Sequence, residues 1–88
     1  GVYLTRTVLE EGEYCGITNV GYKPTVGGES RKGVETFLFD YSGDLYGRQL
    51  KVEFLEFRRP ERKFDSLEAL KAQILSDVHW GRSRLKHY

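Results

Sequence analysis

The sequence predicts a mainly β fold: a small antiparallel barrel with one C-terminal helix. Strand-forming residues alternate between apolar and polar over the first two-thirds of the chain, and turn-forming residues interrupt this stretch several times. The last third has helical periodicity instead. Short antiparallel strands followed by a single helix are typical of a closed or split β-barrel. With 88 residues, the chain has room for one domain and one core.

Turn signals separate the expected strands. Residues 11–13 and 42–44 are expected to form turns, and the glycines and proline of residues 21–33 predict a loop. The strands are therefore expected at residues 2–9, 14–20, 34–41 and 49–57.

The last of these strands favours a barrel. Leu50, Val52 and Phe54 share one face, whereas Leu55 and Phe57 add apolar side chains to the other. We therefore expect the end of this strand to be buried on both faces. Such a strand fits a barrel, over about residues 1–58, whose outside is covered by a helix.

A helix is expected over about residues 66–80. Asp65 can serve as its N-cap with Glu68 three residues later, as in a capping box. Gly81 is expected to end the helix, and the basic residues at 82–87 are expected to be solvated surface. One apolar stripe would dock the helix on the barrel, formed by Leu67, Leu70, Ile74 and Val78.

The charge and the cysteine content exclude several classes of function. A net charge of +1 and a pI near 8.1 create no field strong enough to indicate nucleic-acid or membrane partners. The single cysteine, Cys15, cannot form an internal disulfide, which favours a reducing compartment such as the cytoplasm. Cys15 and the two histidines do not have the spacing of a zinc site. No apolar run approaches the roughly 20 residues needed to span a bilayer.

Glu35 is the most informative single residue. On the expected strand it shares a face with Phe37 and Phe39. An aromatic face would remove water from the carboxylate, raise its pKa and make it a better general base near neutral pH. The alternative is a glutamate at the end of a strand that reaches water at the barrel rim.

Two charged segments are also candidates for binding. Residues 27–33 combine glycines, a hydroxyl and two cations, as a phosphate-contacting flap would, although a solvated hairpin loop has the same composition. Residues 58–64 are expected to connect the last strand to the helix. Within them, Arg59 or Arg62 together with Phe64 would suit a planar ligand with a polar edge, through stacking and guanidinium hydrogen bonds.

Five motifs occur in order along the chain. They are Gly1-Val2-Tyr3, Asn19-Val20-Gly21-Tyr22-Lys23-Pro24-Thr25, Val34-Glu35-Thr36-Phe37-Leu38-Phe39-Asp40, Asp44-Leu45-Tyr46-Gly47, and Arg59-Pro60-Glu61 running into Phe64-Asp65-Ser66-Leu67. Together they resemble the flavokinase (riboflavin kinase) domain of bacterial bifunctional FAD synthetases, over nearly the whole chain. Members of that family transfer the γ-phosphoryl group of ATP to the 5′-hydroxyl of riboflavin, giving FMN. Their fold is a six-stranded antiparallel Greek-key barrel with a helix near the C-terminus.

The resemblance implies roles for individual residues and for ligands. Glu35 falls at the family's catalytic base. The positions that contact the nucleotide are Leu38, Asp40 and Tyr46, and those that hold the isoalloxazine are Arg59, Arg62 and Phe64. The resemblance also implies ATP with Mg²⁺, riboflavin as substrate and FMN as product, and an adenylyltransferase domain in the parent protein.

One family motif is absent. In the family, a Pro-Thr-Ala-Asn motif before the Gly-Val-Tyr strand supplies the threonine and asparagine that hold the metal and the ATP phosphates. This chain has no such motif, so no metal ligand is assigned within it. We expect residues 1–88 to be an N-terminally truncated kinase domain that by itself binds Mg-ATP poorly and has little activity. An unpaired barrel edge would also favour dimerisation.

Two other functions stay open. One is a non-catalytic flavin-binding module that keeps Arg59 and Phe64 without the chemistry. The other is a small oligonucleotide-binding barrel whose aromatic side chains stack on bases. The second predicts steep salt dependence of nucleic-acid binding, and the near-neutral charge argues against it.

Overall fold

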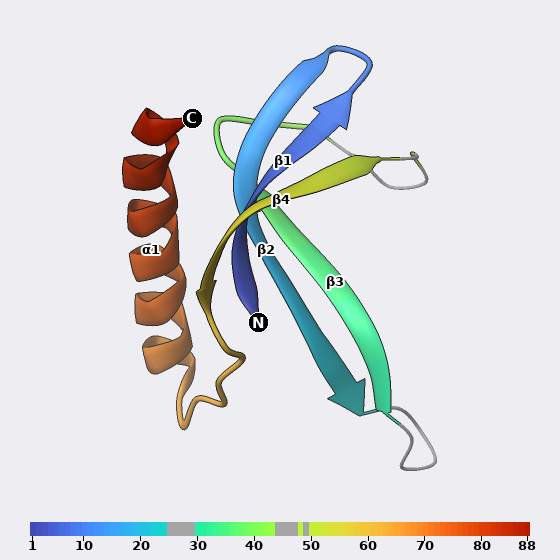
Figure 1. The fold of residues 1–88 in the computed structure, drawn as a ribbon. Helices are drawn as coiled ribbons and strands as arrows, with labels where there is room; N and C mark the ends of the chain where they lie inside the picture. Colours follow the sequence, from blue (N-terminus) through green and yellow to red (C-terminus); the bar gives the residue numbers. More distant parts are fainter. Residues whose placement is uncertain (25–29, 44–47, 49) are drawn as a thin grey trace.

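The computed structural model describes residues 1–24, 30–43, 48 and 50–88 (Figure 1). The elements are the strands β1 (Val2–Leu9), β2 (Gly12–Pro24), β3 (Ser30–Leu38) and β4 (Lys51–Arg59), then the helix α1 (Leu67–Arg84) and a short 3₁₀ helix, η1 (Leu85–His87). The mainly β class with one C-terminal α-helix is therefore confirmed. In the described part of the chain, neither helix is long and apolar enough to cross a lipid bilayer.

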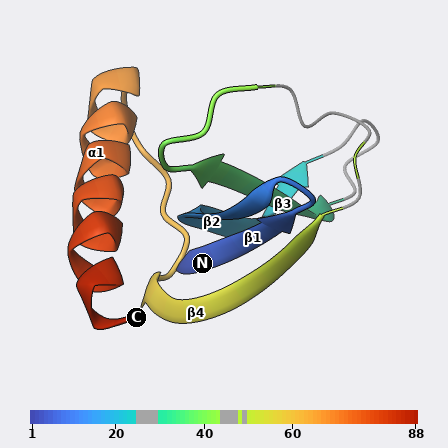
Figure 2. The same ribbon diagram turned by 90° about the horizontal axis from the view of Figure 1, so that it is seen from above.

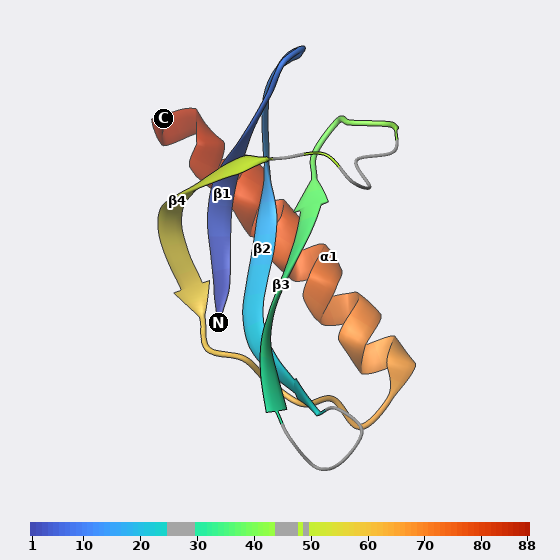
Figure 3. The same cartoon turned by 90° about the vertical axis from the view of Figure 1, so that its right-hand side faces the viewer.

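The four strands form one antiparallel sheet in the order β3-β2-β1-β4. Three consecutive strands pair as neighbours and the fourth returns beside the first, which is the Greek-key order. Figure 3 shows this order from the sheet side, with α1 crossing behind the strands. Among the described strands the sheet curls without closing, because none pairs with the outer edge of β3 or of β4 (Figure 1).

The β2–β3 pair is longer than the sequence predicts. The pairing continues through Gly21 with Gly33 and ends at Pro24 with Ser30, in the segment expected to be a loop. Glycine is a weak strand former, but here the ladder with the partner strand overrides that local preference. At its other end β3 stops at Leu38, three residues earlier than expected, and Asp40 adopts a positive φ of 58° in the turn that follows.

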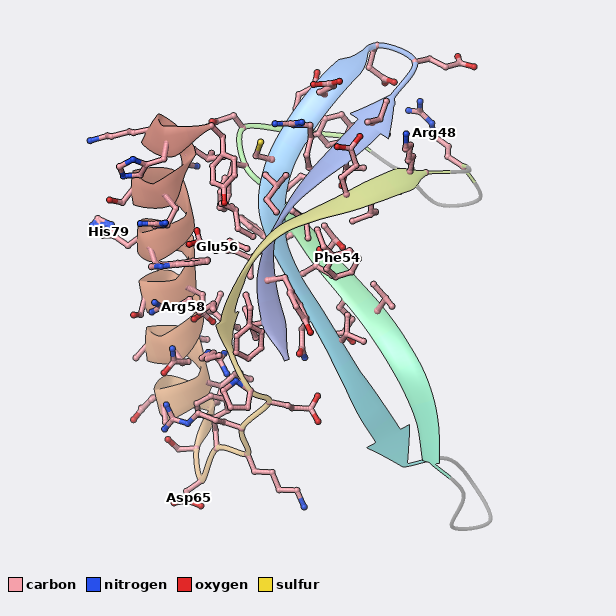
Figure 4. The ribbon with its side chains drawn as sticks, viewed as in Figure 1. Arg48, Phe54, Glu56, Arg58, Asp65 and His79 are labelled. Atoms are coloured by element: carbon pink, nitrogen blue, oxygen red, sulfur yellow. The ribbon has the colours of Figure 1, made fainter. Side chains whose placement is uncertain are left out.

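The prediction that the end of β4 is buried on both faces is wrong. Phe54 and Phe57 are 51% and 55% exposed, and Tyr3 contacts both rings edge-on, with centroid distances of 5.0 and 5.3 Å. The β1–β4 register shifts at two points, and such irregularities change which side chains of a strand face the core. Figure 4 shows Phe54 on the side of β4 away from α1, whereas Glu56 and Arg58 lie between β4 and α1.

The helix starts and ends later than expected. Its N-cap is Ser66, not Asp65: the Ser66 backbone is extended, and its hydroxyl accepts a hydrogen bond of 3.1 Å from the Ala69 N–H. Gly81 does not end the helix, which continues to Arg84. Capping requires a side-chain oxygen in reach of the first free N–H groups, and the Ser66 hydroxyl is in that position.

Gly81 brings the helix close to the sheet. A Cβ atom at this position would lie 2.8 Å from Ile17 Cδ1 and 2.9 Å from Phe39 Cζ, so only glycine allows the observed distance. Phe39 is buried at this contact, as are Val2 and Leu4 on β1. This part of the core therefore lies between the sheet and the helix, which stands on one side of the strands in Figure 2, whereas Thr5, Thr7 and Thr18 are buried on the other face of the sheet.

The basic C-terminal segment is not simply solvated surface. Arg82 pairs with Asp40, with 3.1 Å between Nη1 and Oδ2, and Arg84 makes two hydrogen bonds to Glu56, at 2.6 and 2.7 Å. These two pairs fasten the end of α1 to the turn after β3 and to β4. These two arginines are partly exposed, as expected of solvated surface, but they are also paired with β4 and with the turn after β3 because the helix is longer than expected.

Candidate functional site

A pocket of about 510 Å³ lies between the sheet and the first part of α1. This volume is in the usual range for sites that take small organic ligands. Leu70, Ile74 and Val78 line it from the helix, so three members of the predicted apolar stripe face it. The fourth, Leu67, is 64% exposed and does not line it.

One row of the sheet forms the opposite wall. In the strand register, Glu35 on β3 is opposite Asn19 on β2, Asn19 is opposite Val2 on β1, and Val2 is opposite Arg59 on β4. All four residues line the pocket. Neighbouring strands are about 4.8 Å apart, so the backbone positions of Glu35 and Arg59 are separated by roughly 14 Å along this row. The row gives the pocket a carboxylate at one end and a guanidinium at the other.

The guanidinium end of the pocket also holds an aromatic ring. The Arg62 guanidinium carbon lies 5.3 Å from the centre of the Phe64 ring, and that of Arg59 lies 6.0 Å from it. The connection between β4 and α1 thus folds back so that one ring contacts two cations. This arrangement offers a face for stacking and N–H donors for the edge of a planar ligand.

A buried carboxylate on α1 holds this end in place. Asp77, which is only 2% exposed, accepts hydrogen bonds from Arg59 Nη2 at 2.8 Å, Arg59 Nε at 3.0 Å and Arg58 Nε at 2.9 Å. Gln73 donates to the same carboxylate at 3.1 Å and accepts a hydrogen bond of 2.9 Å from Arg62. Of the two predicted flavin-binding arginines, Arg59 is thereby connected to the helix by the Asp77 carboxylate and Arg62 by the Gln73 amide oxygen.

The Asp77 carboxylate stays ionised despite its burial. Desolvation alone would raise its pKa, but the hydrogen bonds from Arg59, Arg58 and Gln73 together lower the pKa below its ordinary value. A buried carboxylate with several charged donors is a rigid anchor, because any change in the arginine positions would leave a buried charge unpaired.

Glu61 lies at the same wall, where its carboxylate packs directly against the backbone of Gly21. A Cβ atom at residue 21 would overlap that carboxylate. Glycine at this position on β2 therefore makes the space for an acidic side chain from the β4–α1 connection. Two of the resemblance motifs, at residues 19–25 and 59–61, are therefore in contact at this point.

Glu35 lines the pocket but is not dehydrated by an aromatic face. Glu35 and Phe37 are both exposed, whereas Phe39 is buried in the core and contacts Phe37 only edge-on, at 6.3 Å. The expected aromatic face is not formed because β3 ends at Leu38 and the chain turns Phe39 inward. Its role as a base stays a prediction that rests on its place at the end of the row.

Two of the predicted nucleotide residues are described, and neither lines the pocket. Leu38 is at the end of β3, about 10 Å along the strand from Glu35, and Asp40 follows in the turn, where it pairs with Arg82. Tyr46 is outside the described residues, as are residues 27–29 of the segment expected as a flap, whereas residues 30–33 belong to β3. Along β3, the pocket lining extends from Glu35 to Phe37, and the two described nucleotide positions lie just beyond it.

The sequence reasoning missed Asp77, Gln73 and Asn19. A signal for the first two existed: residues 73 and 77 fall at helical spacing beside Leu70 and Ile74, so polar side chains interrupt the face that docks on the sheet. A carboxylate on such a face needs a partner. Asn19 begins one of the five resemblance motifs, but the sequence assigned it no role, because its place between Glu35 and Val2 depends on the strand register.

The described residues do not offer a site for the magnesium ion that the resemblance implies. No cluster of three or more His, Cys, Asp or Glu side chains that could hold a metal occurs among them. Asp40, the nearest acidic residue after Glu35 on this strand, pairs with Arg82.

Comparison with known proteins agrees with the sequence motifs. The model of the riboflavin kinase (flavokinase) family matches residues 1–85. The chain belongs to this family. A bifunctional riboflavin kinase/FMN adenylyltransferase from Pseudomonas fluorescens is 42% identical over 94% of this chain and 27% of its own length. An RNA-binding riboflavin kinase from Bacillus subtilis is also 42% identical, over 89% of this chain and 34% of its own length.

The fold has a close structural relative. The solved structure of a macrolide-efflux protein from Streptococcus pneumoniae superposes with a TM-score of 0.82 at 30% identity, over 93% of this chain and 27% of that chain. The chain thus spans only about a quarter to a third of the proteins that it matches. The similarity concerns one domain of those longer proteins.

Proposed function

We propose that the protein is a riboflavin kinase, which transfers the γ-phosphoryl group of ATP to the 5′-hydroxyl of riboflavin and gives FMN and ADP. The observation that carries the proposal is the pocket between the sheet and α1. Glu35, Arg59, Arg62 and Phe64, each predicted from the sequence for this reaction, line that one pocket. Membership of the riboflavin kinase family supports the same substrate class.

The geometry supports one orientation of the flavin. The isoalloxazine stacks at Phe64, where Arg59 and Arg62 supply N–H donors for its polar edge. The ribityl chain then follows the row of the sheet away from Arg59, and its terminal hydroxyl reaches Glu35. ATP approaches from the end of β3 beyond Phe37, where Leu38 and Asp40 lie.

The reaction needs few chemical groups from the protein. The 5′-oxygen of riboflavin forms a bond to the γ-phosphorus, the bond from that phosphorus to the bridging oxygen of ADP breaks, and the hydroxyl proton passes to the Glu35 carboxylate. Phosphoryl transfer depends mainly on alignment of the two oxygens and on neutralisation of charge. General-base assistance of this kind contributes about 10²–10⁴-fold.

Several parts of the proposal lie outside the described residues. Mg²⁺ would accompany ATP, and the described residues offer no cluster of ligands for it. By analogy with the relatives named bifunctional, an adenylyltransferase domain is expected in the parent protein. Dimerisation through a sheet edge and a cytoplasmic location stay predictions.

Titration of riboflavin and FMN, with flavin fluorescence as the readout, tests the proposal with and without Mg-ADP. Saturable flavin binding is the expected result, and binding that Mg-ADP strengthens would show that part of the nucleotide site is present. If neither flavin binds, the proposed function is wrong for this chain.

Glu35→Gln separates a kinase from a flavin-binding module. In the full-length parent protein, this change is expected to lower kcat by about 10²–10⁴-fold and to leave flavin affinity within a factor of about two. Glu68→Gln, on the exposed first turn of α1, is the matched control and should change neither. Unchanged turnover in Glu35→Gln would exclude the general-base role. Flavin binding without turnover in the unaltered parent protein would favour the module.

A further inference from the structure

Asn19, which lines the pocket, has an unsatisfied hydrogen-bond acceptor. Its side-chain oxygen Oδ1 is buried and has no hydrogen-bond partner among the described residues. Thr7 Oγ1 is also buried and unpartnered within the described part of the chain, but Thr7 does not line the pocket. A buried acceptor without a partner is unfavourable, and native proteins keep few of them.

The position of Asn19 indicates what would satisfy this oxygen. In the register row, Asn19 lies between Glu35 at one end and Val2 and Arg59 at the other. A ligand that reaches from the arginines to Glu35 must therefore pass Asn19. The part of riboflavin between its ring and its terminal hydroxyl is the ribityl chain, which carries O–H donors along its length.

We propose that Asn19 is a substrate-binding residue that selects flavins with a hydroxylated side chain, because its Oδ1 accepts a hydrogen bond from a ribityl hydroxyl. This inference rests on the proposed function, from which the direction of the flavin is taken. The hydrogen bond both orients the ribityl chain toward Glu35 and removes the cost of the unsatisfied oxygen. A site with a buried acceptor strongly disfavours an analogue that lacks the matching donor.

The test compares two flavins, two variants of Asn19 and one control variant. Riboflavin has the ribityl chain, and lumiflavin has a methyl group in its place, so only riboflavin can bond to Asn19. Asn19→Leu keeps the size of the side chain but removes the acceptor, and Asn19→Ala is a second variant in case leucine disturbs the strand. Thr7→Val is the matched control, because it removes the other unpartnered buried oxygen away from the pocket.

The expected result has two parts. Asn19→Leu weakens riboflavin binding about tenfold, which corresponds to about 1.4 kcal/mol, and changes lumiflavin binding less than twofold. The thermal stability of the unliganded variant is unchanged or higher, because an unsatisfied polar atom has been removed. Thr7→Val likewise keeps or raises stability and leaves both flavin affinities unchanged.

The other outcomes overturn the inference in distinguishable ways. Equal riboflavin affinity in Asn19→Ala and the unaltered protein would exclude the hydrogen bond. An equal loss of riboflavin and lumiflavin binding in both Asn19 variants would assign the residue to the shape of the pocket. Failure of the unaltered protein to bind riboflavin would refute the proposed function, and the inference with it.

Discussion

Replacing Asp77 by alanine is the sharpest test of how the helix organises the site. The change removes a carboxylate that is 2% exposed and that accepts four hydrogen bonds from three side chains. It leaves the guanidinium groups of Arg58 and Arg59 side by side without their shared counter-charge. Those two side chains are 21% and 16% exposed, so water can solvate them only in part.

The size of the effect follows from this geometry. Removing one partner of a buried ion pair costs about 3–5 kcal/mol. Partial access of water to the two arginines places the expected loss near the lower limit, at about 3 kcal/mol. For a domain of this length, each kcal/mol shifts Tm by about 4–8 °C, so Asp77→Ala should lower Tm by about 12–24 °C. Stability of small domains is itself only about 5–15 kcal/mol.

Thermal and urea denaturation, followed by circular dichroism, measure this loss. Asp65→Ala is the control, because Asp65 is exposed and precedes the same helix (Figure 4). Flavin affinity, measured below the melting transition of the variant, should also fall, since Arg59 and the Gln73–Arg62 contact lose their anchor. A loss below about 1 kcal/mol with unchanged flavin binding would refute the reasoning that Asp77 positions these arginines.

Three further predictions follow from the helix and its docking. Ser66→Ala should lower the free energy of unfolding by about 1 kcal/mol in urea titration, whereas Asp65→Ala should change it by less than about 0.5 kcal/mol. A larger loss in Asp65→Ala than in Ser66→Ala would identify Asp65 as the N-cap. Gly81→Ala should destabilise by about 1–3 kcal/mol despite the better helix propensity of alanine, because the new methyl meets Ile17, and a gain in Tm would contradict that close contact. The folded pKa of Asp77 is lowered, so its contribution is complete above about pH 4 and is lost as the pH falls through the folded value. Below pH 4, the free energy of unfolding should therefore decline less steeply in Asp77→Ala than in the unaltered protein. Equal slopes in the two proteins would show that Asp77 does not cause the decline.

Local chemistry was enough to predict the kinds of element and their order. The alternation in residues 2–9, the turn after Leu9 and the helical spacing of Leu70, Ile74 and Val78 are all properties of neighbouring residues. The nearness of Arg59, Arg62 and Phe64 also follows from their short separation in the chain. These features need no knowledge of which strand pairs with which.

The boundaries depended on contacts between distant segments. The ladder between Gly21 and Gly33 extends β2 and β3 through a stretch with weak strand propensity. Gly81 lies inside the helix and does not end it. A glycine is present there because the close contact with Ile17 and Phe39 leaves no room for a Cβ atom. Local propensity alone predicted a loop in the first case and a helix end in the second.

The sequence by itself determined a mainly β chain with a C-terminal helix and a set of residues suited to a flavin. Only the tertiary structure decided that Glu35, Asn19 and Arg59 lie in one row, and that Asp77 on α1 holds the arginine. The physical reason is that strand register and the partners of buried polar groups are set by long-range pairing, in which a shift of one residue would turn each side chain to the opposite face of the sheet.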